Sequence, residues 1–289
     1  MFYKNFKAFQ EIRKICMVDL EKILRARKDL RNKEPLIHAI THPISINMVA
    51  NAILFLGAKA ICASHPEEVG EIVKMADSLS ISLGNITAER MAAIDLACKA
   101  ANEKKTPLII DMVGVGASTL RYDFAMELLD KYNFDLIKGN SSEIRALAKG
   151  KSNAIGIDVG KADEISKENI ENIAKEARSL AEKYQTTVIV TGKTDLVVTE
   201  KSYITVDNGV ETLSKITGTG CMVTAMVSSF MAVTDPVTAS LCGLLVMEIA
   251  AEKADTEGLY TFFVNLMDQI GLISDCEIRE KAKVREIKF

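Results

Sequence analysis

The sequence lacks paired cysteines, a metal-binding histidine motif and any sign of a secretory leader. No unbroken apolar stretch follows Lys4 and Lys7, as it would in a signal peptide. The histidines, His38, His42 and His65, do not combine with the cysteines into a zinc motif. With no CxxC pair either, we expect reduced thiols and a cytoplasmic protein. The cysteines are Cys16, Cys62, Cys98, Cys221, Cys242 and Cys276.

Charge of one sign and long hydrophobic runs are also missing. The formal net charge is −3 with the signs mixed along the chain, so no basic stripe favours a nucleic-acid partner. The most apolar runs, Met222–Val233 and Val237–Ala251, are each shorter than the roughly 18 to 20 residues that a spanning helix needs. Asp235-Pro236 separates them, and the second run contains Glu248. They predict two buried helices of a soluble core and no membrane partner.

The composition that remains is that of an ordinary globular protein, with 48% hydrophobic residues, 26% charged residues and five prolines. Short β-rich runs alternate with longer amphipathic stretches, which is typical of an α/β fold whose mainly parallel sheet has helices on both faces. The expected strands are Leu36–Ile40, Ala60–Ala63, Ser78–Leu83, Pro107–Asp111, Leu136–Lys138 and Thr187–Thr191. The expected helices are Asn47–Leu56, Glu67–Met75, Thr87–Lys104, Tyr122–Lys131, Ser141–Ala148 and Ala162–Tyr184.

The two ends of the chain depart from this alternation. The runs Asp195–Thr199 and Ser202–Val206 predict an antiparallel hairpin at a sheet edge, and the sequence after Gly218 predicts helices only. No linker or internal repeat divides the chain, so we expect one domain over residues 1–289. Residues 1–16 form either an extra N-terminal helix or an extension that precedes a start at Met17.

Acidic residues follow two of the expected strands, at the edge where open parallel sheets bind ligands. Asp111 closes an apolar strand ahead of Gly114 and Gly116, where a carboxylate suits Mg²⁺ or, equally, caps the next turn. Asn140 and Glu143 follow the next strand with the spacing of a capping box. Glu143 lies at the same edge as Asp111, so it is also a candidate for the metal site.

Two further segments suit phosphate. Thr191 and Gly192 end a strand, where they fit a nucleotide or a simple hairpin turn. The turn from Gly218 to Cys221 opens a long apolar helix, and its small residues expose backbone amides at the positive end of the helix dipole. Such a turn forms an anion hole for a transferring phosphoryl group, although a plain helix start is also rich in small residues. It is neither a Walker A loop nor a dinucleotide fingerprint.

In this order the segments resemble the hydroxyethylthiazole kinase family, which has a ribokinase-like fold. The resemblance runs from about Pro35 to the C-terminal helices and includes Pro35–Thr41 and Asn47–Ala58. It implies ATP- and Mg²⁺-dependent phosphorylation of the hydroxyethyl group of 4-methyl-5-(2-hydroxyethyl)thiazole, a step of thiamine salvage. It also implies a homotrimer with active sites between subunits. The apolar Ile53–Ile61 region would then lie at an interface, while a core role is equally compatible.

The resemblance also implies roles for individual residues. Related sugar kinases have an aspartate base where this chain has Cys221, which is expected close to the substrate hydroxyl. A thiol is a poorer base, so whether Cys221 takes the proton stays open. The implied contacts are Arg121, Thr191 and Asn140 for ATP, Asp111 and Glu143 for Mg²⁺, Gly218, Cys62 and His42 for the thiazole, and Thr219, Gly220 and Cys221 for the anion hole.

The chain departs from the family pattern mainly in the alcohol pocket. His42-Pro43 stands where the family usually has Asn-Asn or Asn-Asp, and Cys62 stands where it usually has methionine. Asp111-Met112 also replaces the usual Asp-Pro. Two alternatives therefore stay open: a ribokinase-like kinase for a different small alcohol, or a catalytically weak sensor of thiazole or nucleotide. Retention of Asp111, Glu143 and the Gly218–Gly220 turn argues against the sensor.

Overall fold

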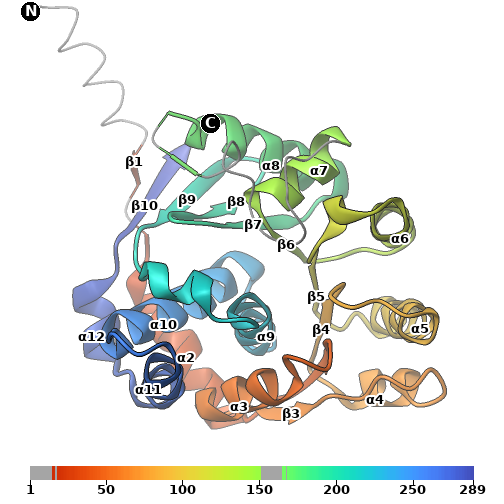
Figure 1. The fold of residues 1–289 in the computed structure, drawn as a ribbon, viewed down its shortest axis with the longest axis horizontal. Helices are drawn as coiled ribbons and strands as arrows, with labels where there is room; N and C mark the ends of the chain where they lie inside the picture. Colours follow the sequence, from red (N-terminus) through yellow and green to blue (C-terminus); the bar gives the residue numbers. More distant parts are fainter. Residues whose placement is uncertain (1–14, 17, 151–164, 167) are drawn as a thin grey trace, which may run out of the picture.

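The computed structural model describes residues 15–16, 18–150, 165–166 and 168–289. One sheet of ten strands runs through these residues in the order β1-β10-β9-β8-β7-β6-β5-β4-β2-β3 (Figure 1). The six strands from β7 to β3 are parallel, as predicted, and the rest are antiparallel. The strands are β1 (Ile15–Cys16), β2 (Leu36–Ile40), β3 (Lys59–Ile61), β4 (Ser78–Ser82), β5 (Leu108–Asp111), β6 (Leu136–Asn140), β7 (Thr187–Thr191), β8 (Asp195–Val198), β9 (Ser202–Val206) and β10 (Val284–Lys288).

Helices cover both faces of this sheet. One layer contains α4 to α8, and the other contains α2, α3 and α9 to α12 (Figure 1). The helices are α2 (Leu20–Lys33), α3 (Ile46–Leu56), α4 (Val69–Met75), α5 (Ala88–Lys104), α6 (Thr119–Lys131), α7 (Ser141–Lys149), α8 (Ile170–Tyr184), α9 (Thr219–Met231), α10 (Pro236–Ala254), α11 (Leu259–Leu272) and α12 (Asp275–Lys281), with short 3-10 turns η1 (Val115–Ala117) and η3 (Glu211–Lys215).

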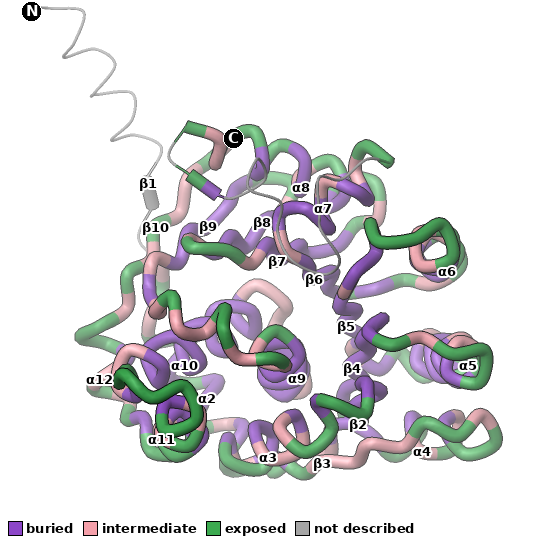
Figure 2. The backbone as a smooth tube through the Cα atoms, viewed as in Figure 1, coloured by how far each residue is buried: buried purple, intermediate pink, exposed green. Residues whose placement is uncertain are grey.

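The central strands are buried at nearly every position because each strand packs against helices on both faces. Successive side chains of a strand point to opposite faces, so Ile109 of β5 packs into one buried cluster and Ile110 into the other. The same alternation separates Leu136 from Ile137 in β6. Figure 2 shows these strands buried along their length, with exposed residues on the outer surfaces of the helices.

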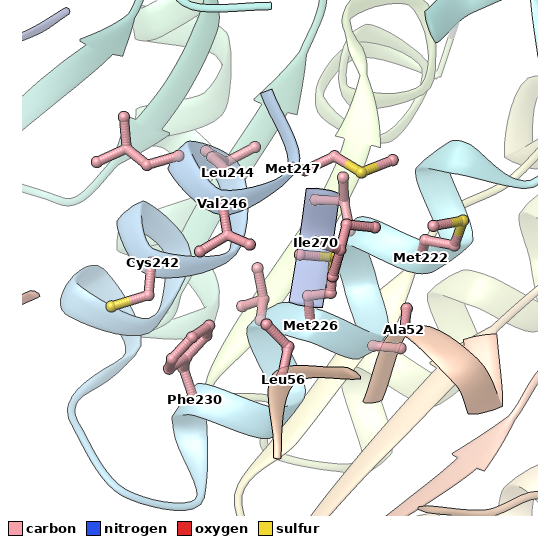
Figure 3. Close-up of a cluster of buried hydrophobic side chains, with 14 of the residues drawn as sticks. Ala52, Leu56, Met222, Met226, Phe230, Cys242, Leu244, Val246, Met247 and Ile270 are labelled. Carbon is pink, nitrogen blue, oxygen red and sulfur yellow. The ribbon is translucent and has the colours of Figure 1, made fainter. Parts of the chain in front are cut away.

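Helices α9 and α10 are the two apolar runs of the sequence, and they lie inside the protein. Their side chains interlock with α3 and α11, as Met226, Phe230 and Leu56 illustrate (Figure 3). Gly243 permits this close packing, because an added Cβ would lie 2.5 Å from Cγ2 of Val227. No described helix is long and apolar enough to cross a membrane. The packing holds α9 rigidly, with its first turn at the carboxyl ends of β4 and β5.

Four expectations need correction. Three concern the edge of the sheet and the ends of the chain, and the fourth concerns one helix. The hairpin β8–β9 is antiparallel as predicted, but it does not lie at the sheet edge, since β10 pairs with β9 and β1 with β10. The sequence after Gly218 is therefore not purely helical: Val284–Lys288 alternates in sequence and completes the sheet. Residues 15–16 are extended rather than helical; the rest of the expected N-terminal helix (1–14) lies outside the described residues.

The fourth correction concerns α8, which begins at Ile170 rather than at residue 162, after a turn at residues 168–169. Residues 162–164 and 167 lie outside the described part of the chain. The other expected strands, and the other helices expected between the parallel strands, are present with ends shifted by a few residues. Strands β2 and β7 match their predicted bounds.

Candidate active site

Strand register brings the predicted acidic residues to one edge of the sheet. Ser82 of β4 pairs with Asp111 of β5, and Asp111 pairs with Lys138 of β6. One step further, Asn140 of β6 pairs with Thr191 of β7. Because these strands are parallel, all five side chains lie at the carboxyl edge, facing the first turn of α9.

A buried ion pair occupies the centre of this edge. The Lys138 ammonium donates to both oxygens of Asp111, at 3.1 and 3.0 Å, and the two side chains are only 4% and 0% exposed. Thr224 of α9 donates from Oγ1 to Oδ2 of Asp111 at 2.8 Å. Burial opposes the charge on Lys138, but nearby Asp111, Cys221 and Glu143 raise its pKa above the ordinary value. The pair ties α9 to β5 and holds a permanent positive charge beside the turn.

Glu143 lies beside this pair and is held by backbone amides. Its carboxylate accepts from the amide of Gly114 at 2.8 Å and from that of Asn140 at 2.7 Å. The Asn140 side chain accepts from the amide of Glu143 at 2.9 Å, so the predicted capping box is confirmed. Burial and the neighbouring Asp111 raise the pKa of Glu143 to about 7. The capping box alone explains both residues structurally, yet it also fixes a carboxylate next to Asp111.

The turn that starts α9 is built around two glycines beside the Lys138 ammonium. Gly218 has φ +93°, a left-handed conformation that favours glycine. An added Cβ there would also lie 2.2 Å from Cε of Met48, so a side chain would have to displace Met48. At Gly220 an added Cβ would lie 3.2 Å from Nζ of Lys138. The Thr219 hydroxyl donates backward to carbonyls of the preceding loop, at 3.1 and 3.2 Å. No side chain among the described residues caps the helix at Gly218, so its first amides face the site beside the Lys138 ammonium.

Cys221 contacts His42, although 179 positions of sequence separate the two residues. Its sulfur lies 3.3 Å from Nε2 of His42 and 3.7 Å from Oγ of Ser82. Burial and Asp111 raise the pKa of the Cys221 thiol, against the opposing effects of Lys138 and of the Ser82 and Ser45 hydroxyls. Burial, and then the charge of Arg90, lower the pKa of His42. Both groups are therefore neutral near pH 7.

The remaining predicted residues surround this centre. Arg121 of α6 donates from Nη1 to the carbonyls of Leu83 and Val113, so its guanidinium joins the ends of β4 and β5. A pocket of about 220 Å³ lies between η1, α6 and the end of α7, and Thr119 and Tyr122 of α6 help to line it. Cys62 lies one strand beyond β2, half-buried against the core, and burial raises its thiol pKa. Among the described residues, no hydrogen bond links Cys62 to Cys221 or His42.

Sequence reasoning missed three residues that complete the arrangement: Lys138, Thr224 and Arg90. Lys138 stands directly before the Gly139-Asn140 segment, where a lysine inside an apolar strand was an available signal. Thr224 lies one helical turn after Gly220, and its hydroxyl also donates to that residue's carbonyl. Arg90 is buried and donates to the carbonyls of three loop residues, which are Ser82, Gly84 and Asn85.

Comparisons with known proteins agree on one family. The sequence model described as "Hydroxyethylthiazole kinase family" matches residues 27–275. The chain is 40% identical over 262 residues to "Hydroxyethylthiazole kinase 2" of Clostridium botulinum, which covers 90% of this chain and 99% of that protein. The crystal structure of hydroxyethylthiazole kinase from Pyrococcus horikoshii superposes with a TM-score of 0.83 at 36% identity, covering 92% of this chain and 99% of that one.

A more distant structure defines the fold class. A ribokinase-like superfamily protein from Enterococcus faecalis has a TM-score of 0.57 at 10% identity, covering 89% of this chain and 96% of that one. At that identity the likeness concerns the fold alone. The predicted ribokinase-like α/β fold is confirmed.

Proposed function

The chain belongs to the hydroxyethylthiazole kinase family, and we propose on this basis that it transfers the γ-phosphoryl group of ATP to the hydroxyethyl group of 4-methyl-5-(2-hydroxyethyl)thiazole, a salvage step toward thiamine. The observation that carries the chemistry is the glycine turn of α9 set against the buried Lys138–Asp111 pair. Backbone amides and an ammonium converge there, which is the environment that a transferring phosphoryl group requires.

Two features of the protein stabilise the negative charge of the transferring phosphoryl group: the backbone amides of the turn and the Lys138 ammonium. Gly220 has no side chain, so the Lys138 ammonium approaches the turn closely, and the amides at Thr219, Gly220 and Cys221 point outward from the helix start. A phosphoryl group that loses its bond to the leaving oxygen spreads negative charge over its equatorial oxygens. The fixed amides and the ammonium stabilise that charge without reorganising, which is worth about 3 kcal/mol for each donor.

We assign ATP to the side of the site that contains Arg121, Thr191 and Asn140. Asn140 and Thr191 are paired neighbours across β6 and β7, and Arg121 closes the opposite side by bridging β4 and β5. The pocket that Thr119 and Tyr122 of α6 help to line would hold part of the nucleotide. The guanidinium suits the planar, bidentate recognition of phosphate oxygens.

Mg²⁺ fits the same edge through Asp111 and Glu143. Mg²⁺ is usually held by one or two carboxylates together with waters and substrate phosphates. Asp111 is paired with Lys138, and burial and the nearby Asp111 charge disfavour ionisation of Glu143, so a cation bound between these carboxylates would favour the ionised form of Glu143. Each oxygen that accepts a hydrogen bond retains a second lone pair for a water of the ion's shell. When bound, the ion would neutralise part of the negative charge of the phosphates. No described group of three or more acidic, histidine or cysteine side chains competes as a metal site.

The alcohol pocket lies on the other side of the turn, where we place the thiazole against Gly218 and His42, with Cys62 at its periphery. The packing of Met48 against Gly218 makes an apolar wall suited to a small ring. His42 and Cys62 replace two usual pocket residues, and this observation favours one alternative, a kinase for a different small alcohol.

We also propose the homotrimer, with sites between subunits. The expected interface region divides in two: Ile53 and Leu56 are core residues, whereas Leu54 and Phe55 are 51% and 42% exposed. Helix α11 contacts α3 and adds further exposed apolar residues. These are Leu259, Tyr260, Val264 and Leu272. Exposed aliphatic and aromatic side chains on two adjoining helices support a subunit interface.

A turnover assay tests the function. The full chain is supplied with ATP and Mg²⁺ over a panel of small alcohols that includes hydroxyethylthiazole, and ADP release is measured. Turnover of the thiazole above all others is expected. Turnover of another alcohol alone would select the altered kinase, and thermal stabilisation by ligands without ADP release would select the sensor.

A further inference from the structure

His42 occupies a prepared position between two segments of the site. It follows β2, and its ring lies against Gly84 at the end of β4, where an added Cβ would be 2.4 Å from Cδ2 of His42. Gly84 therefore leaves the space that the ring fills. Arg90 fixes this loop by donating to the carbonyl of Gly84 at 2.6 Å. The packing of this loop therefore holds the His42 ring in one position.

The two ring nitrogens have different partners. Nε2 lies 3.3 Å from the sulfur of Cys221, in a buried contact between side chains that are 8% and 6% exposed. Nδ1 is buried and has no hydrogen-bond partner among the described residues. A buried ring nitrogen without a partner needs a ligand atom or a water. One side of the imidazole is thus engaged with the sulfur and the other is open to an incoming group.

We propose that His42 and Cys221 form a proton relay in which His42 is the final acceptor of the proton of the substrate alcohol. This inference rests on the proposed phosphoryl transfer. The neutral thiol donates to Nε2, so Nδ1 carries the ring hydrogen. Cys221 contacts the alcohol, and His42 acts through it.

Two protons move in this relay. The alcohol O–H bond breaks and a new S–H bond forms at Cys221, while the original S–H bond breaks and an N–H bond forms at Nε2. The alcohol oxygen bonds to the γ-phosphorus of ATP as the bond to the ADP oxygen breaks. The products are the phosphate ester, ADP and the His42 imidazolium. After product release, the thiol of Cys221 gives its proton to water while the Nε2 proton of His42 returns to the sulfur, which restores the neutral ring with its hydrogen on Nδ1.

The surrounding charges suit an acceptor that starts neutral. Arg90 and Arg121 face the ring and disfavour its charged form, whereas Asp111 favours it. Burial keeps both ring and thiol uncharged, so a relay through the sulfur never requires a buried free thiolate. The raised pKa of the Cys221 thiol keeps it protonated, and a protonated thiol is a poor proton acceptor; the neutral imidazole offers a free lone pair at Nε2 instead.

The test is a double-mutant cycle with steady-state kinetics on the full chain. His42→Asn should lower kcat at least about 100-fold, the low end for a proton acceptor, since a loose phosphoryl transition state demands little base strength. In a Cys221→Ala background, where the relay is already broken, His42→Asn should cost less than about 3-fold. Equal losses in both backgrounds would overturn the relay, because an independent pocket role is additive.

Two further readouts separate chemistry from structure. The kcat of the wild type should fall as pH drops through the lowered pKa of His42, below the separate fall near pH 7 that Glu143 contributes, and His42→Asn should lack this lower acidic limb. Cys221→Asp supplies its own acceptor, so His42 should become dispensable for kcat in that background; Cys221→Ala carries the cycle if the aspartate variant unfolds. The control is His65→Asn, an exposed histidine, whose kinetics should match the wild type.

The outcomes distinguish the relay from the function beneath it. A wild type that turns over no alcohol overturns the proposed function together with the relay. An active wild type whose His42→Asn variant retains kcat and the lower acidic limb overturns the relay alone. A change confined to KM would make His42 a pocket residue and would also overturn it.

Discussion

Gly220 offers the sharpest test of the anion hole, because its substitution changes the site with little effect on the fold. It is the second residue of α9, in a backbone conformation that alanine accepts. An added Cβ would lie 3.2 Å from Nζ of Lys138, tighter than an ordinary contact. Lys138 cannot retreat freely, since it is buried and bound to both oxygens of Asp111. A methyl group there displaces either the ammonium or the helix start.

The two consequences differ in size. Alanine in place of glycine favours a helix by up to about 1 kcal/mol, which roughly offsets a small shift of the Lys138–Asp111 pair. The free energy of unfolding should therefore change by less than about 1 kcal/mol. Loss of one donor from the phosphoryl site costs about 3 kcal/mol of transition-state stabilisation, which corresponds to roughly a 100-fold lower kcat. Gly220→Val, which adds two further carbons, should abolish measurable transfer.

The assay is ADP release under saturating ATP and alcohol, run beside thermal and urea unfolding of each variant. Gly70→Ala is the matched control, because an added Cβ at Gly70 of α4 has no atom within 4 Å. It should leave kcat unchanged. Gly220→Val with wild-type kcat and a wild-type melting temperature would refute the anion hole. A kcat loss matched by lost stability would instead indicate damage to α9.

Three further predictions address the buried charges. Asp111→Asn leaves the Lys138 ammonium unpaired, so it should lower the free energy of unfolding by about 3 kcal/mol, reduce kcat strongly and weaken the Mg²⁺ dependence; unchanged kinetics would remove Asp111 from the metal site. Thr224→Val removes a buried hydroxyl bonded to Asp111 and should cost about 2 kcal/mol in urea unfolding, and a cost near zero would contradict the tie between α9 and β5. Burial and the neighbouring Asp195 raise the pKa of Glu248 in the folded protein. The protonated Glu248 carboxyl therefore stabilises the fold fully below its unfolded pKa of about 4.3, and this stabilisation is lost as pH rises through the folded pKa. Glu248→Gln keeps a donor to Asp195 at every pH, so its stability between pH 6 and 9 should fall less than that of the wild type; parallel curves would show that the pair does not share a proton.

The buried helices and parallel strands could be predicted because local pattern and burial agree for them. A strand buried on both faces reads as a continuous apolar run, and β2 and β7 match their predicted bounds for this reason. Strand β10 was missed because its alternation follows a long helical region and its residues are only partly buried. Its partner β9 lies almost eighty positions earlier, and pairing over that separation leaves no local mark.

The candidate site divides in the same way. Asp111, Glu143 and the turn of α9 could be found from sequence, since each belongs to a local motif, whether a strand end, a capping box or a helix start. Lys138 and Thr224 were missed because their importance depends on Asp111, which lies in a different element. Cys62 was placed in the alcohol pocket by the resemblance alone, and it lies directly after β3, the strand at one edge of the sheet.

Sequence alone predicted the mainly parallel α/β fold, because hydrophobic periodicity acts over a few residues, and the order of its motifs carried the resemblance to a kinase family. Helix-start chemistry, which is also local, marked the Gly218–Cys221 turn as the one that we propose binds phosphate. Only the tertiary structure decided what surrounds that turn. Lys138 reaches Gly220 through strand register, and His42 reaches Cys221 across 179 positions of sequence because Gly84 leaves room for its ring. Contacts of this kind depend on packing between distant segments, and the chemistry of the site depends on them.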